Sequence, residues 1–106
     1  MDQRKYPRIR VRGLSIDVSD GIGCCSAAVS DVSRGGLCLA ELAKRFGKKN
    51  DKFTVVATNG ENHFKFQVKP RWEEAGRWSK KIGVEIDSAP WQWMAYVISL
   101  EKRRLI

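Results

Sequence analysis

The feature that most constrains the fold is a two-residue alternation of apolar and polar side chains through residues 53–86. The apolar positions of this alternation are Phe53, Val55, Ala57, Phe64, Phe66, Val68, Pro70, Trp72, Trp78, Ile82, Val84 and Ile86. A period of two is typical of β-strands that bury one face. Asn59-Gly60, a favoured hairpin turn, and the Glu74-Ala75-Gly76 turn divide the segment. The pattern predicts three antiparallel strands, and Pro70 predicts an edge or a bulge in the middle one.

Residues 9–39 predict three further strands. Their apolar positions move from odd numbers before Gly13 to even numbers after it, and a β-bulge at this glycine would absorb the extra residue. Small and β-branched residues in 23–31 predict the second strand, and the alternation in 37–39 predicts a short third one. Residues 31–36 form a tight connection. Six antiparallel strands favour an all-β fold, a small closed or nearly closed antiparallel β-barrel.

A C-terminal helix is expected after the last strand. The positions that follow a helical period are Trp93, Val97 and Leu100. Ser88 is a candidate N-cap with Pro90 in the first turn. An apolar helix here would pack on the barrel and cover one end of it. One or two helical turns are also predicted over residues 42–47, because Leu42 and Phe46 lie four apart with a glycine following.

A chain of 106 residues is expected to form a single domain. We divide it into a flexible basic arm (residues 1–12), a barrel (residues 13–87) and the C-terminal helix (residues 88–106). With 20 Lys and Arg against 12 Asp and Glu, the net charge is +8. Such a charge favours an anionic partner, which at this point can be nucleic acid, a nucleotide phosphate or an anionic lipid surface.

Few side chains are available for metal or covalent chemistry. His63 is the single histidine of the sequence, and the three cysteines are Cys24, Cys25 and Cys38. An odd number of cysteines without C-x-x-C spacing favours small core residues in a reducing cytoplasm over disulfides or zinc. No segment approaches the roughly 20 apolar residues that span a bilayer, so no membrane insertion is expected. The sequence predicts a cytoplasmic protein with no metal, no cofactor and no enzymatic activity.

Two short segments carry a binding signal. The first contains Arg4 and Arg8, and the second contains Asp31, Ser33 and Gly36. A guanidinium matches both a phosphate and the O6/N7 edge of guanine, whereas a carboxylate accepts from the N1 and N2 donors of guanine. Glycines at positions 35 and 36 would permit unusual φ angles and close approach of a ligand. Taken singly, the segments are also compatible with a solvated basic arm and with ordinary turn chemistry.

In this order, R-x-x-x-R followed by [D/N]-x-S-x-x-G resembles the PilZ domain, over essentially the whole chain. The resemblance implies a six-stranded barrel with a C-terminal helix that binds the bacterial second messenger cyclic di-GMP. The ligand-binding residues that it implies are Arg4, Arg8, Asp31, Ser33, Gly36 and Trp72. For Trp72, stacking on a guanine and packing in the barrel core are both open. Gln3, where many members carry another arginine, leaves one or two ligand molecules per protein open.

Several functions are compatible with these residues. The leading hypothesis is a cyclic di-GMP receptor whose arm folds against the barrel on binding and changes a surface that an effector protein reads. A degenerate PilZ module would instead act through protein contacts without ligand. A general nucleic-acid-binding barrel would use the positive charge, but the dispersed basic residues argue against it. Residues 91–104 as a membrane-surface or partner-docking helix are a further alternative, with core packing favoured.

Overall fold

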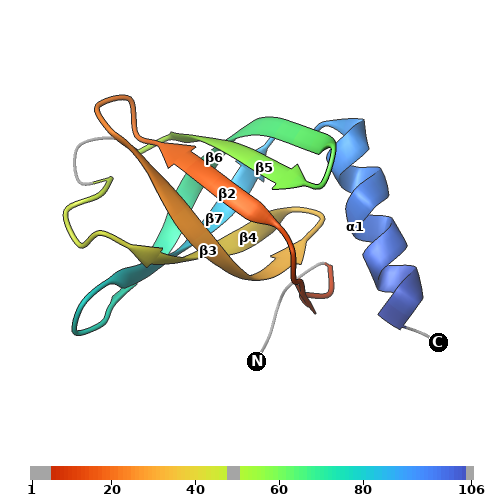
Figure 1. Ribbon diagram of the computed structural model, residues 1–106, viewed down its shortest axis with the longest axis horizontal. Helices are drawn as coiled ribbons and strands as arrows, with labels where there is room; N and C mark the ends of the chain where they lie inside the picture. Colours follow the sequence, from red (N-terminus) through yellow and green to blue (C-terminus); the bar gives the residue numbers. More distant parts are fainter. Residues whose placement is uncertain (1–5, 48–50, 105–106) are drawn as a thin grey trace.

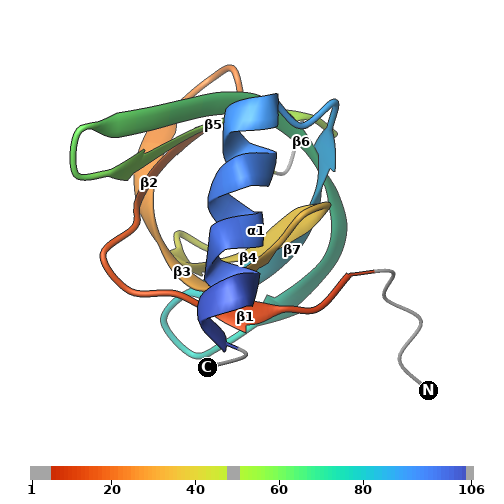
Figure 2. The same ribbon diagram turned by 90° about the vertical axis from the view of Figure 1, so that its right-hand side faces the viewer.

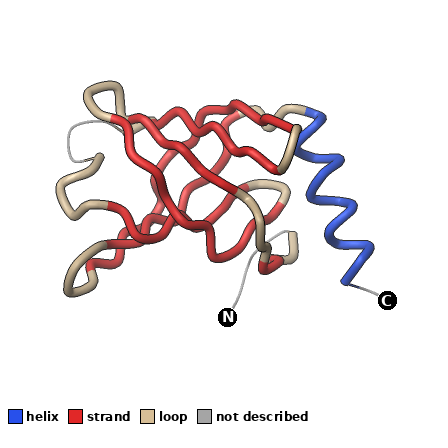
Figure 3. Tube along the Cα trace, viewed as in Figure 1, coloured by secondary structure: helices blue, strands red, loops and turns tan. Residues whose placement is uncertain are grey.

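Around the molecule each strand pairs with its neighbours until the sheet closes on itself. In the computed structural model of the protein, the structure is described for residues 6–47 and 51–104. The elements are β1 (Ile9–Arg10), β2 (Ser15–Ser19), β3 (Cys24–Ser33), β4 (Gly36–Leu42), β5 (Phe53–Asn59), β6 (Asn62–Ala75), β7 (Lys80–Asp87) and α1 (Trp91–Arg104). Antiparallel pairing runs β3-β2-β5-β6-β7-β4, and β4 returns to β3 (Figures 1 and 3). The predicted all-β six-stranded barrel with a C-terminal helix is therefore confirmed.

The first predicted strand is two strands. β1 pairs with the end of β3, where Arg10 lies opposite Asp31, and β2 pairs with the beginning of β3, where Ile16 lies opposite Ala27. Between them the chain leaves β3 around Gly13, which has a φ of 78°. The break falls at the glycine where the apolar phase changes, but the interruption is longer than a single-residue bulge. β1 is thus a short extra strand on the edge of β3, outside the six that close the barrel.

Alternate strand residues fill the barrel, and α1 lies across one end of it (Figure 2). Trp93 and Val97 of α1 are fully buried, and the Trp93 ring centroid lies 5.6 Å from that of Phe64 and 5.0 Å from that of Phe66. The predicted core packing of this helix is confirmed. Ser88 is not its N-cap, because the carbonyl of Pro90 accepts the first helical hydrogen bond, from the Met94 amide at 3.1 Å.

The helical turns predicted over residues 42–47 are absent. Leu42 is the last residue of β4 and pairs with Lys80, so the chain stays extended where helix was expected. A single turn follows, closed by a hydrogen bond from the Phe46 amide to the Ala43 carbonyl at 3.0 Å. Phe46 packs against Phe53 with ring centroids 5.1 Å apart. Burial of both Leu42 and Phe46 against the barrel outweighs the local helical spacing.

The β6–β7 hairpin departs from the predicted apolar phase at its tip. Trp78, expected in the last strand, lies in the turn and is 86% exposed. Lys80 occupies an inward position of β7 and is only 2% exposed. Its ammonium donates to the Phe46 carbonyl at 2.6 Å and to Glu73 Oε1 at 2.8 Å. A long lysine stem can replace an apolar side chain when acceptors of this kind meet its charged end.

The cysteines only partly match their prediction as small core residues. Cys38 is buried, Cys25 is half-buried with the pKa of its thiol raised by burial, and Cys24 is exposed. Among the helices of the described chain, none is long and apolar enough to cross a membrane. Across residues 6–47 and 51–104, no three His, Cys, Asp or Glu side chains gather as a metal site would require.

Candidate functional site

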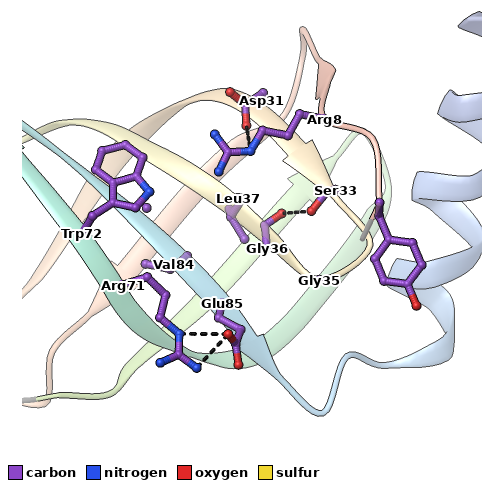
Figure 4. A pocket seen from close by; sticks show the side chains of 12 residues that line it. Arg8, Asp31, Ser33, Gly35, Gly36, Leu37, Arg71, Trp72, Val84 and Glu85 are labelled. Carbon is purple, nitrogen blue, oxygen red and sulfur yellow. Dashed lines mark hydrogen bonds and ion pairs between the residues drawn. The ribbon is translucent and has the colours of Figure 1, made fainter. Parts of the chain in front are cut away.

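A cleft of about 430 Å³ lies on the outer surface of the barrel, between the β3–β4 turn and the β6–β7 pair (Figure 4). Its lining residues are Tyr6, Arg8, Asp31, Ser33, Gly35, Gly36, Leu37, Arg71, Trp72, Gly83, Val84 and Glu85. Five of the six residues implied by the resemblance are among them. The sixth, Arg4, lies outside the described residues.

One wall of the cleft combines a guanidinium with a carboxylate. Arg8 stands immediately before β1, and its Nε lies 4.0 Å from Oδ1 of Asp31 on β3. The register between β3 and β4 shifts between Val29 and Val32, so Asp31 falls within an irregular part of that pairing. The guanidinium of Arg8, a hydrogen-bond donor, and the carboxylate of Asp31, a hydrogen-bond acceptor, therefore lie side by side at the edge of the cleft (Figure 4).

The floor is the β3–β4 turn seated on β7. The Ser33 hydroxyl donates to the Gly36 carbonyl at 3.3 Å, and the Gly35 carbonyl accepts from the Ile86 amide at 2.9 Å. A Cβ on Gly36 would collide with the carbonyl oxygen of Val84. Neither Gly35 nor Gly36 has a positive φ, so the expected unusual backbone angles are wrong at these positions. The absent side chain of Gly36 instead allows β4 to lie close to β7.

The opposite wall depends on a β-bulge. Pro70 pairs with Val84 and Trp72 pairs with Gly83, which leaves Arg71 as an extra residue of β6. A bulge changes the face to which the following side chain points. Trp72 accordingly leaves the inward phase, is 38% exposed and lies over Gly83, where a Cβ would collide with its indole. The alternative in which Trp72 packs in the barrel core is therefore wrong, whereas the bulge expected at Pro70 is confirmed.

Among the lining residues that the sequence did not indicate, three have polar or aromatic side chains that a ligand could contact: Tyr6, Arg71 and Glu85. Arg71 and Glu85 face each other across β6 and β7, with Nη2–Oε2 at 2.7 Å and Nε–Oε2 at 2.8 Å. The hydrogen bond lowers the pKa of Glu85 and raises that of Arg71. Tyr6, from the N-terminal segment, completes the lining. The available signals were the positions of Arg71 beside Trp72 and of Tyr6 within the arginine motif.

Together the two walls suit a flat ligand that carries both hydrogen-bond donors and hydrogen-bond acceptors. Arg8 offers donors for a phosphate or for the O6/N7 edge of a purine, while the Asp31 carboxylate offers acceptors for ring and exocyclic N–H groups. Trp72 offers an aromatic face, on which any base can stack. The Arg71–Glu85 pair adds a second donor and acceptor beside that face.

Comparison with solved structures identifies the fold, although no family model and no curated protein matches the sequence. The Bacillus subtilis inhibitor of motility MotI/DgrA matches with a TM-score of 0.79 and 14% identity, over 99% of this chain and 53% of that one. The PilZ domain of Escherichia coli YcgR, solved with c-di-GMP, matches with a TM-score of 0.75 and 17% identity, over 97% and 95%. The K. pneumonia MrkH–c-di-GMP complex matches with a TM-score of 0.72 and 12% identity, over 100% and 57%. This chain thus spans about half the length of MotI/DgrA and of MrkH. The barrel, its terminal helix and these matches show that the chain folds as a PilZ-like domain.

Proposed function

We propose that this protein binds cyclic di-GMP in the cleft and acts as a receptor that regulates a partner protein. The observation that carries the proposal is that Arg8, Trp72 and the Asp31–Gly36 segment with Asp31, Ser33 and Gly36 are three separate parts of the sequence, and all of them line one cleft. The YcgR PilZ domain and MrkH, whose folds this chain resembles, were both solved with c-di-GMP.

Each side chain has a role that its chemistry permits. Arg8, assisted by Arg4 from outside the described residues, contacts phosphate and the O6/N7 edge of a guanine. Asp31 accepts from N1 and N2 of a guanine, and Ser33 adds a hydroxyl that can donate or accept. Trp72 stacks on a base, a contact worth roughly 1 to 3 kcal/mol. The protein needs no cofactor for this function.

Binding acts as a signal through the N-terminal segment. The arginines that grip the ligand precede β1, so occupancy of the cleft favours the conformation in which this segment lies against the barrel. A ligand shifts a conformational equilibrium by its differential affinity for the two states. The ligand-favoured surface is then read by an effector protein, in the cytoplasm where such nucleotides act.

Isothermal titration calorimetry tests the proposal. Cyclic di-GMP is titrated into the wild type, into Arg8→Ala and into Arg77→Ala, with GTP as a control anion. Arg77→Ala removes the same charge from the exposed β6–β7 turn, where the side chain stacks on Trp78 at 5.5 Å. We expect saturable binding to the wild type and to Arg77→Ala, loss in Arg8→Ala, and none for GTP.

The binding stoichiometry answers the question raised by Gln3. No heat for the wild type, together with no binding by fluorescence anisotropy of a labelled ligand, would refute the receptor function and favour a degenerate module. Binding of single-stranded DNA with a steep salt dependence would point instead to a nucleic-acid-binding barrel.

A further inference from the structure

We propose that Arg34 and Glu101 are positioning residues that hold residues 6–8, immediately before β1, at the cleft, so that helix α1 takes part in ligand binding. This inference rests on the proposed function and extends it to the element that the ligand would influence.

The first observation is a two-point ion pair between distant parts of the chain. Arg34 Nε lies 2.9 Å from Glu101 Oε2, and Arg34 Nη2 lies 2.8 Å from Glu101 Oε1. The Glu101 side chain is 15% exposed and that of Arg34 is 31% exposed. Two parallel hydrogen bonds fix the plane of a guanidinium as well as its position. The β3–β4 turn, which contains Arg34 between Ser33 and Gly35, is thereby tied to the C-terminal part of α1.

The second observation is that Tyr6 rests on this turn. The Cζ atom of Arg34 lies 5.2 Å from the centroid of the Tyr6 ring. A Cβ on Gly35 would lie 3.9 Å from Tyr6 Cδ2, at ordinary van der Waals distance. A cation over the face of an aromatic ring is attracted to it, and a carboxylate that fixes the guanidinium keeps the cation at that place.

Pro7 connects this contact to the cleft. Proline restricts its own φ and keeps the preceding residue extended, so the positions of Tyr6 and Arg8 are linked with little freedom. When the Tyr6 ring lies against Arg34, Arg8 is placed with its Nε 4.0 Å from Oδ1 of Asp31. The order of contacts is therefore Glu101 to Arg34, Arg34 to Tyr6, and through Pro7 to Arg8.

The direction of the coupling follows from this arrangement. The conformation that brings Arg8 to the cleft is also the one in which Arg34 is paired with α1. A ligand that contacts Arg8 in the cleft therefore favours the conformation in which α1 is paired with Arg34. By thermodynamic reciprocity, a change that breaks the pairing of α1 with Arg34 lowers the affinity for the ligand. Binding of a ligand in the cleft then changes how firmly α1 is held, and α1 is the part of the surface that responds to the ligand.

The test begins with Glu101→Gln, which keeps the shape of the side chain and removes its charge. The matched control is Asp87→Asn, which removes the carboxylate paired with Lys52 at 3.8 Å and does not alter a residue that lines the cleft. We expect cyclic di-GMP to bind Glu101→Gln roughly two- to tenfold more weakly and Asp87→Asn unchanged. Hydrogen exchange of the ligand-free protein should be faster at residues 8–10 in Glu101→Gln only.

A charge exchange separates positioning from simple stabilisation. The double variant Arg34→Glu with Glu101→Arg restores an ion pair to the helix but places no cation over Tyr6. We expect this double variant to have a higher Tm than Glu101→Gln but no higher affinity for cyclic di-GMP. Wild-type affinity in Glu101→Gln, or recovery of affinity in the double variant, would overturn the inference. If the wild type itself does not bind, the proposed function fails, whereas unchanged exchange at residues 8–10 in Glu101→Gln would refute the positioning role by itself.

Discussion

Replacing Gly83 with alanine should abolish the proposed stacking of a base on Trp72 and leave the barrel folded. The indole of Trp72 lies over Gly83 so closely that an added Cβ would collide with Cε2 and Nε1 of the ring. These are atoms of a partly exposed side chain, which can move away. Gly36→Ala is the matched comparison, because there the obstacle is the backbone carbonyl of Val84 in the neighbouring strand.

The expected magnitudes differ for the two variants. In Gly83→Ala the displaced indole loses a low-energy rotamer, which costs about 0.5 to 1.5 kcal/mol of stability. Loss of base stacking weakens ligand binding by about 1 to 3 kcal/mol, or roughly five- to 150-fold in Kd. In Gly36→Ala the β4–β7 pair has to separate, and overpacking of this kind typically costs about 1 to 3 kcal/mol. Gly36→Ala should therefore have the larger fall in Tm.

Thermal unfolding and calorimetric titration with cyclic di-GMP measure both quantities. Trp72→Ala should weaken binding to the same extent as Gly83→Ala, and the double variant should show no further loss, because both changes remove one contact. Wild-type affinity in Gly83→Ala would refute the assignment of Trp72 as the stacking platform. A smaller loss of stability in Gly36→Ala than in Gly83→Ala would refute the distinction between a movable ring and a fixed strand.

Three further outcomes are expected. Lys80→Met should lower the free energy of unfolding by about 1 to 3 kcal/mol in urea titration, since a buried carbonyl loses its ammonium donor; an unchanged midpoint would contradict this. Hydrogen bonding from Arg34 lowers the pKa of Glu101. The carboxylate therefore stabilises the fold at pH values above the usual glutamate pKa of about 4.3, and this contribution disappears as the pH falls through the lowered pKa. The Tm difference between wild type and Glu101→Gln should shrink below about pH 4, and a constant difference would argue against the ion pair. Asp20→Ala removes an acceptor for the Gly47 amide at 3.1 Å, so exchange at Gly47 should accelerate while affinity for cyclic di-GMP stays unchanged.

The barrel could be predicted because burial of one sheet face imposes a period of two on the sequence. Val55, Phe66 and Val84 all follow that period and are all buried. The change of phase at Gly13 marks the place where the chain leaves β3. The prediction of helix over residues 42–47 is wrong because a spacing of four between Leu42 and Phe46 fits both a helical turn and a strand followed by a tight turn. Only the pairing of β4 with β7 distinguishes the two.

The cleft could be predicted as far as its residues form a local motif. Arg8, Asp31, Ser33 and Gly36 are recognisable from their spacing, and they do line one cleft. Glu85 was not recognisable, because an outward-facing glutamate on a strand becomes part of a site only when its cross-strand neighbour is known.

Both walls of the cleft coincide with places where regular strand pairing fails. Asp31 lies within the register shift between β3 and β4, and Arg71 is the extra residue of the bulge between β6 and β7. In an unbroken ladder, Trp72 would continue the inward phase of Phe66 and Val68 and would be buried. The bulge turns it outward over Gly83 and sets Arg71 beside it. Because an alternation of apolar residues reports only the regular pairing, the side chains that shape this cleft are those for which the pattern predicts the wrong face or no role.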